Sequence, residues 1–464
     1  MLVMAAACGS MGGGAGDDFG ATPGGVKDLT LARELIARGQ VPPAAAILVE
    51  AMFAEHDLGL TGPPCSDVLC LRGGLGVAPG ADDTLRGWIQ VGLSSTIDPA
   101  TYLRPDTTFI YTVDVSGSMQ WGHGESTPGE LARGLLGGLT PRLTARDQAA
   151  IVTYGSEVRT ALPITAGDAR SAIARVIAGL SEAGSTDMEG GLRRAYELGR
   201  SARAAGRTNV RIVLFTDVQP NVGATSPSAF DQLVTAGAAA GVDLTVVALG
   251  VGIGPEVLQS MANQRGANAF SLVTTGDVAR FLADQDPWFA APIATALRVS
   301  VRLGAGLAID RGYGFPVGFE EDPTLKVESV FLSKHKGALL LALDGDVTAL
   351  APGLDLTYVD PAGTTHQTTI ALDRAGATLD ERSQWFEQAS VARTTALALV
   401  TQAMHDAAEG YATAPADAEA ILRSAVERFE ADAAALADPD LGVEVELAQA
   451  LLRLVEARAP QGTL

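Results

Sequence analysis

Residues 109–119 read FIYTVDVSGSM, and this stretch decides how the rest of the chain is interpreted. The apolar, β-branched run 109–113 has the length and composition of a buried strand. Asp114, Ser116 and Ser118 follow at alternating positions in a glycine-containing turn, so one carboxylate and two hydroxyls can face one point. Such an all-oxygen cluster suits a hard divalent cation, and Mg²⁺ in particular uses few carboxylates. The stretch therefore predicts a strand that ends in a metal-binding loop.

Two further segments supply oxygen-bearing side chains later in the chain. The loop GSTDMEGGL at 184–192 opens an amphipathic helix and carries Thr186. A second apolar strand, 210–215, is followed by Thr216 and Asp217. Short Asp and Ser turns also occur as ordinary caps and Asx-turns. Because three separate strand or helix termini each carry such residues, we favour a common site over unrelated turns of an α/β sheet.

These segments resemble the metal-ion-dependent adhesion site of von Willebrand factor type A (vWA) domains, with its D-x-S-x-S turn, later Thr and strand ending in Thr-Asp. The resemblance implies a doubly wound, mostly parallel α/β sheet and a bound Mg²⁺, or Mn²⁺ or Ca²⁺ in its place. The five residues that it assigns to the metal are Asp114, Ser116, Ser118, Thr186 and Asp217. One departure is Val218, which stands where the family usually has glycine, so that a Cβ must fit near the metal.

The pattern of expected elements divides the chain into five regions. Strands and helices alternate in the central region, whereas the next has strands alone and the last has long helical stripes. The regions are a flexible tether at 1–25, a helical and strand segment at 26–105, the vWA domain at 106–288, a β-sandwich at 289–375 and a helical region at 376–464. This order resembles bacterial envelope vWA proteins, in which the segment ahead of the vWA domain packs with a C-terminal β domain.

The cysteines bear on the compartment. Cys8 follows small residues and precedes a glycine-rich, acidic stretch, which resembles a bacterial lipobox and predicts a lipoprotein of the cell envelope. The preceding segment is short and lacks basic residues, so a ragged terminus is the alternative. No uninterrupted apolar run reaches transmembrane length, so we expect membrane attachment only through Cys8. Cys65 and Cys70 are either a disulfide of an oxidising compartment or two unrelated buried thiols.

Composition and missing motifs exclude several function classes. The formal net charge of −21 argues against a nucleic-acid partner, because phosphates require neutralisation by Lys and Arg. The glycine-rich GVGIG at 250–254 lacks the third glycine of a dinucleotide fingerprint. The sequence has no P-loop, no nucleophile elbow and no clustered histidines. We therefore do not expect an enzyme.

The resemblance implies a metal-dependent protein-binding module whose partner presents an Asp or Glu to the metal. One alternative is a structural scaffold of the envelope whose metal site is permanently occupied. Another is a partner of a MoxR-type AAA+ ATPase, which requires a cytoplasmic location. Trp121 and His123 lie on the loop after Ser118 and either contact a partner or remain ordinary loop residues.

Overall fold

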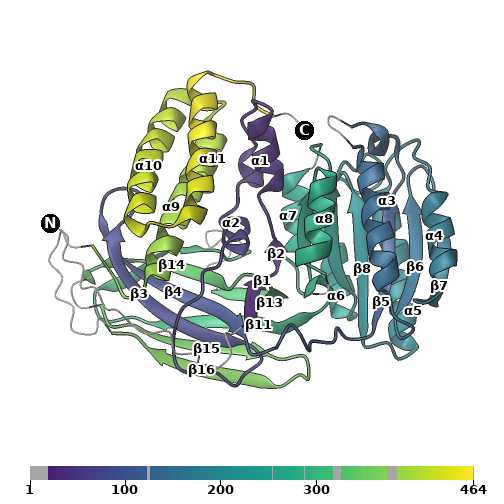
Figure 1. The fold of residues 1–464 in the computed structure, drawn as a ribbon, viewed down its shortest axis with the longest axis horizontal. Coiled ribbons are helices and arrows are strands. Elements are labelled where there is room, and N and C mark those ends of the chain that lie inside the picture. Colours follow the sequence, from purple (N-terminus) through teal and green to yellow (C-terminus); the bar gives the residue numbers. More distant parts are fainter. Residues whose placement is uncertain are drawn as a thin grey trace.

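The molecule combines a parallel sheet wrapped by helices, a large antiparallel sheet and a layer of long C-terminal helices (Figure 1). This computed structural model describes residues 19–122, 126–252, 254–286, 288–316, 325–347, 350–373 and 384–462. Cys8 and His123 lie outside the described residues. Among the described helices none is long and apolar enough to cross a membrane.

The parallel sheet has seven strands, and all neighbours run parallel except β6 and β7. In spatial order they are β2 (Gly25–Val26), β10 (Asn268–Leu272), β9 (Asp243–Leu249), β8 (Asn209–Thr216), β5 (Thr107–Asp114), β6 (Gln148–Tyr154) and β7 (Arg159–Ala166). This confirms the expected doubly wound, mostly parallel sheet. The sequence patterns did not predict β7, because it is a mostly exposed edge strand with little apolar signal.

Helices cover both faces of the parallel sheet. They are α3 (Pro128–Leu139), α4 (Arg170–Ala178), α5 (Met188–Ala204), α6 (Pro227–Ala239), α7 (Pro255–Ala262) and α8 (Thr275–Asp284). Apolar side chains of α3, α4 and α8 share one core cluster with Phe109, Tyr111 and Val113 of β5. Those of α5, α6 and α7 share the opposite cluster with Ile110. Both faces of β5 are therefore buried, which explains its continuous apolar run.

Residues 19–25 were expected to belong to a flexible tether, and this expectation is wrong for them. β1 (Phe19–Pro23) pairs with strands of the antiparallel sheet, and β2 follows directly and pairs with β10 of the parallel sheet. Gly25, at φ 84°, lies in the left-handed region that favours glycine. The segment therefore joins the two sheets through backbone pairing, which its glycine-rich sequence does not reveal.

The antiparallel sheet draws its ten strands from several regions of the chain. Besides β1 they are β3 (Cys70–Pro79), β4 (Leu85–Ser95), β11 (Pro292–Arg302), β12 (Leu307–Tyr313), β13 (Lys326–Ser333), β14 (Gly337–Gly345), β15 (Gly353–Val359), β16 (Thr365–Ala371) and β17 (Trp385–Phe386). A β-sandwich formed by 289–375 alone is therefore wrong, since β4 pairs with β3, β14 and β1.

The antiparallel sheet folds over on itself, so that β3 and β4 lie above β15 and β16 (Figure 1). Leu75 and Ile89 from the upper strands share one apolar cluster with Leu354 and Leu356 of β15. Directly before β3, Cys65 and Cys70 form a disulfide, which is the first of the two alternatives for these cysteines.

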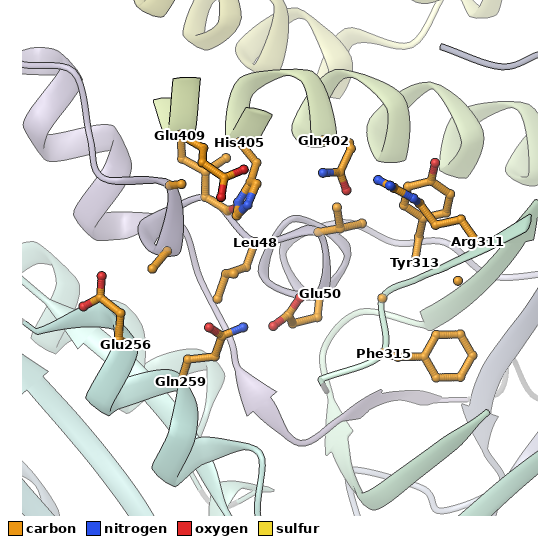
Figure 2. Close-up of a pocket in the computed structure, with 16 residues that line it drawn as sticks. Leu48, Glu50, Glu256, Gln259, Arg311, Tyr313, Phe315, Gln402, His405 and Glu409 are labelled. Carbon is orange, nitrogen blue, oxygen red and sulfur yellow. The ribbon is translucent and has the colours of Figure 1, made fainter. Parts of the chain in front are cut away.

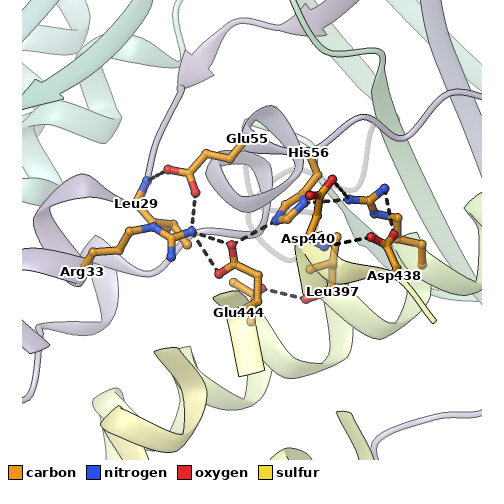
Figure 3. Close-up of polar contacts among 10 residues, drawn as sticks. Leu29, Arg33, Glu55, His56, Leu397, Asp438, Asp440 and Glu444 are labelled. Atoms are coloured by element: carbon orange, nitrogen blue, oxygen red, sulfur yellow. Dashed lines mark hydrogen bonds and ion pairs between the residues drawn. The ribbon is translucent and has the colours of Figure 1, made fainter. Parts of the chain in front are cut away.

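The C-terminal helices pack on the N-terminal helices across a network of charged side chains. The helices are α1 (Thr30–Ala37), α2 (Val49–Glu55), α9 (Ala389–Gly410), α10 (Pro415–Leu436) and α11 (Pro439–Glu456). Arg33 of α1 donates to Glu55 at 2.5 Å and to Glu444 of α11 at 2.8 Å (Figure 3). His56 Nε2 lies 3.2 Å from the same Glu444 carboxylate. These contacts fix α1 relative to α11.

Candidate metal site

The site begins where β5 ends. Asp114 is 1% exposed, and its Oδ1 accepts the backbone N–H of Ser116 at 2.8 Å, which is an Asx-turn. This turn leads into the short 3₁₀ segment Gly117–Gln120. The hydroxyl oxygens of Ser116 and Ser118 lie 3.1 Å apart. The turn predicted from the strand 109–113 therefore brings one carboxylate and two hydroxyls together.

The neighbouring strand β8 delivers the second carboxylate to the same edge of the sheet. Val113 is paired in register with Phe215, so Asp114 and Thr216 end adjacent parallel strands. The Thr216 hydroxyl donates to Asp114 Oδ2 at 3.3 Å. Asp217 is 3% exposed, and its Oδ1 atom is buried and has no hydrogen-bond partner among the described residues.

The loop that carries Thr186 is held against this turn by backbone hydrogen bonds. Gly117 N–H donates to Gly184 O at 3.0 Å, and Thr186 N–H donates to the Asn221 side chain at 2.8 Å. The Thr186 carbonyl accepts the N–H groups of Asn221 and Val222, both at 3.2 Å. Thr186 is 1% exposed. Three loops therefore converge at this edge of the sheet.

Burial and mutual repulsion make the two carboxylates difficult to ionise together. Burial, reinforced by the charge of Asp217, raises the pKa of Asp114 to about 7. Burial also raises the pKa of Asp217, and an interaction with the Ser118 hydroxyl partly offsets this effect. A divalent cation held by these residues would offset both the cost of burying the charges and their repulsion. It would also give Asp217 Oδ1 a partner. The donor set of carboxylates and hydroxyls fits Mg²⁺.

Val218 follows Asp217 directly, and its side chain was expected to need space near the metal because the family usually has glycine at this position. Its φ of 56° lies in the left-handed region, which costs a β-branched residue roughly 1–2 kcal/mol. Its N–H donates to the Thr216 hydroxyl at 2.9 Å, and its side chain is 2% exposed in the core. The side chain therefore fits, and apolar burial offsets the backbone strain.

A cavity of about 70 Å³ connects the site to the surface, and Ser118 and Asp217 line it. Trp121 lines the same cavity and is 71% exposed, so its ring does not pack away on its own loop. Arg38, directly after the end of α1, also lines this cavity. The sequence patterns did not suggest Arg38, because only the docking of the N-terminal helix brings it to the vWA domain.

Comparison with known proteins identifies the domain that carries this site. Residues 109–219 match the family model of the von Willebrand factor type A domain, so the chain contains a vWA domain. The uncharacterized protein YfbK of Escherichia coli K12 is 29% identical over 223 residues, which are 47% of this chain and 38% of that protein. The chain thus matches well under half of that relative's length.

A solved structure shows a similar fold at low sequence identity. A von Willebrand factor type A protein from Catenulispora acidiphila has a TM-score of 0.50 and 13% identity, over 82% of this chain and 89% of that one. The ArnB paralog VWA2 from Sulfolobus acidocaldarius has a TM-score of 0.47 and 13% identity, over 84% and 97%. At such identities the likeness concerns the fold alone.

Proposed function

We propose that this protein is a metal-dependent protein-binding module. The residues that would hold Mg²⁺, or Mn²⁺ or Ca²⁺, are Asp114, Ser116, Ser118, Thr186 and Asp217. When bound, the cation would offer a coordination position to an Asp or Glu carboxylate of the partner. The observation that carries the proposal is the buried pair of Asp114 and Asp217, with its orphaned oxygen, beside a cavity that opens to the surface.

The rim of the cavity supplies the contacts that would select the partner. Trp121 offers an exposed aromatic surface, a residue type that often anchors interfaces. The Arg38 Nε donates to Glu34 at 2.7 Å, which orients a guanidinium on the wall of the cavity. A guanidinium there complements an acidic partner segment, and its charge would speed the encounter. We expect a partner whose metal-binding acid has a second acid nearby.

We further propose a location in the bacterial cell envelope, with Cys8 as the lipid anchor. The disulfide between Cys65 and Cys70 supports an oxidising compartment, because such bonds are rare in the cytosol. The same bond speaks against the alternative of a cytoplasmic partner of a MoxR-type ATPase. Labelling of bacteria with a palmitate analogue, comparing wild type with Cys8→Ser, tests the anchor. Equal labelling of both proteins would reject it.

Selection of binders from a random peptide library tests the proposed function. The library is bound in Mg²⁺ and eluted with EDTA, and Asp217→Asn protein serves as the matched control. We expect eluted sequences enriched in Asp and Glu, and no enrichment on the variant. Metal-independent binders, or binders without an acid, would contradict the proposal.

One observation favours an alternative function, that of a structural scaffold with a permanently bound metal. The backbone hydrogen bonds of Gly117, Thr186 and Asn221 already join three loops, and a metal would reinforce them. The scaffold predicts loss of folding in EDTA and no exchange of binders. Binding by the proposed function instead requires metal-stripped protein that stays folded and regains peptide binding when Mg²⁺ returns.

A further inference from the structure

A second cavity, of about 430 Å³, lies where four parts of the chain meet (Figure 2). Its walls come from the N-terminal segment around α2, from α7 of the vWA domain, from β12 of the antiparallel sheet and from α9. It shares no lining residue with the cavity at the metal site. An occupant could therefore bridge several of these parts, at a place separate from the metal site.

One polar group that lines this cavity is the Glu50 carboxylate in the first turn of α2. The side chain as a whole is partly buried, but its Oε1 atom is fully enclosed and has no hydrogen-bond partner among the described residues. Burial raises the pKa of Glu50 to about 8, although an interaction with the Gln259 side chain partly offsets this effect. A cationic partner would therefore stabilise the Glu50 carboxylate in its charged form.

The rim adds further acceptors. Glu256 of α7 and Glu409 of α9 line the cavity, and both are exposed. His405 Nδ1 lies 3.0 Å from Ile47 O, and since a carbonyl only accepts, this nitrogen carries the proton. The lining therefore presents three carboxylates, whereas Arg311 is the one arginine or lysine among the described lining residues.

An apolar surface separates the inner acid from the outer acids. In the view of Figure 2, Leu48 lies between Glu50 on one side and Glu256 and Glu409 on the other. Ile47 also lines the cavity. A ligand that fits has a cationic group at each end and a short hydrocarbon chain between them. A single metal ion would leave this apolar surface unused.

We propose that this cavity binds a short aliphatic diamine. One ammonium group pairs with Glu50, the second lies between Glu256 and Glu409, and the carbon chain packs on Leu48. Charge-assisted hydrogen bonds in a partly dry site supply the affinity, and the two charged ends select diamines over monoamines. Such a ligand would stabilise the contact between the vWA domain and the C-terminal helices.

Titration calorimetry of 1,4-diaminobutane into the full chain, in EDTA, tests this proposal. Butylamine and NaCl at matched ionic strength are the reference solutes. We expect one site that prefers the diamine, and Glu50→Gln should weaken it roughly tenfold or more because a charge-assisted pair is lost. Glu427→Gln, an exposed residue of α10 that lines none of these cavities, is the matched control and should leave binding unchanged.

Proton release gives a second readout. Because Glu50 is largely protonated at pH 7, pairing with an ammonium group should release protons, so the binding heat should vary with the ionisation enthalpy of the buffer. The charged and titratable groups that face it are Glu256 on α7, Arg311 and Tyr313 on β12, and His405 and Glu409 on α9. The proton release should disappear in Glu50→Gln.

Three results would overturn the proposal. The first is no heat beyond that of matched NaCl, and the second is equal affinity for butylamine and the diamine. The third is unchanged diamine binding in Glu50→Gln. If that variant does not fold, the double variant Glu256→Gln and Glu409→Gln on the exposed rim decides instead, and it should bind the diamine no better than butylamine.

Discussion

The hydroxyl of Thr216 donates to Asp114 Oδ2 at 3.3 Å and accepts the N–H of Val218 at 2.9 Å. It thereby links Asp114, at the end of β5, to the turn that follows β8. Asp217 lies in this turn, between Thr216 and Val218. The hydroxyl is fully buried, so neither neighbour can replace it with water. This side chain therefore positions the Asp114 carboxylate and the turn that carries Asp217.

Replacing Thr216 by Val should therefore destabilise the protein. The change keeps the shape but leaves a buried N–H and a buried carboxylate oxygen without their partner, at a cost of about 1–3 kcal/mol. Urea unfolding of metal-stripped protein measures it, with Thr216→Ser as the control that keeps the hydroxyl. If Thr216→Ser loses as much stability as Thr216→Val, packing of the Thr216 methyl group and not its hydrogen bonds is responsible.

The gain in stability from Mg²⁺ should increase with pH. Asp114 has a pKa near 7 in the folded, metal-free protein and an ordinary low pKa when unfolded. Metal-free protein should accordingly lose stability as pH rises from about 4 to 7, because the native state binds more protons there. Mg²⁺ binds the ionised form, so its affinity should fall up to about tenfold per pH unit below 7. Thermal melts at pH 5 to 8, with and without Mg²⁺, measure this, and a gain independent of pH would contradict it.

Arg38→Gln should weaken the binding of acidic peptides without changing the affinity for Mg²⁺. Arg38 lines the cavity but is not among the proposed metal-holding residues. The loss of one rim charge should cost about 1 kcal/mol, or roughly fivefold in Kd, and less at high salt. Arg159→Gln on the exposed edge strand β7 is the control. If both variants weaken peptide binding equally, Arg38 acts only through the net charge of the protein and the prediction is wrong.

Glu444→Ala should loosen the C-terminal helices. Burial alone would raise the pKa of Glu444, but His56 and Arg33 together hold it below its usual value (Figure 3). Among the described residues, removing this carboxylate leaves Arg33 paired with Glu55 and His56 paired with Arg393. Since Arg33 is partly exposed, we expect a cost of about 1–3 kcal/mol. Hydrogen exchange should show faster exchange in α11, and unchanged protection there would contradict this role.

Local patterns were sufficient for the central strands of the parallel sheet and for the strand and turn at which the candidate site begins. Asp114, Ser116 and Ser118 follow an apolar run that is buried on both faces, so strand and turn could both be predicted from adjacent residues. The assignment of these residues and of Thr186 and Asp217 to a metal stays a prediction. The fold class, in contrast, is confirmed by the sheet order and by the family match to residues 109–219.

Features that depend on long-range docking could not be predicted. β1 and β2 are strands only because they pair with β13 and β10, several hundred residues away. β3 and β4 complete the antiparallel sheet, so no pattern within 289–375 could show its extent. Arg38 and Glu50 face their cavities because α1 and α2 pack against the vWA domain. The spacing of residues along the sequence does not predict contacts between such distant segments.

Titration calorimetry of Mg²⁺ into metal-stripped protein, beside Asp114→Ala, tests the central claim most directly. The claim predicts one site in the wild type, affinity that falls below pH 7, and no binding in the variant. Absence of Mg²⁺ and Mn²⁺ binding to the wild type, or equal binding to the variant, would contradict the claim.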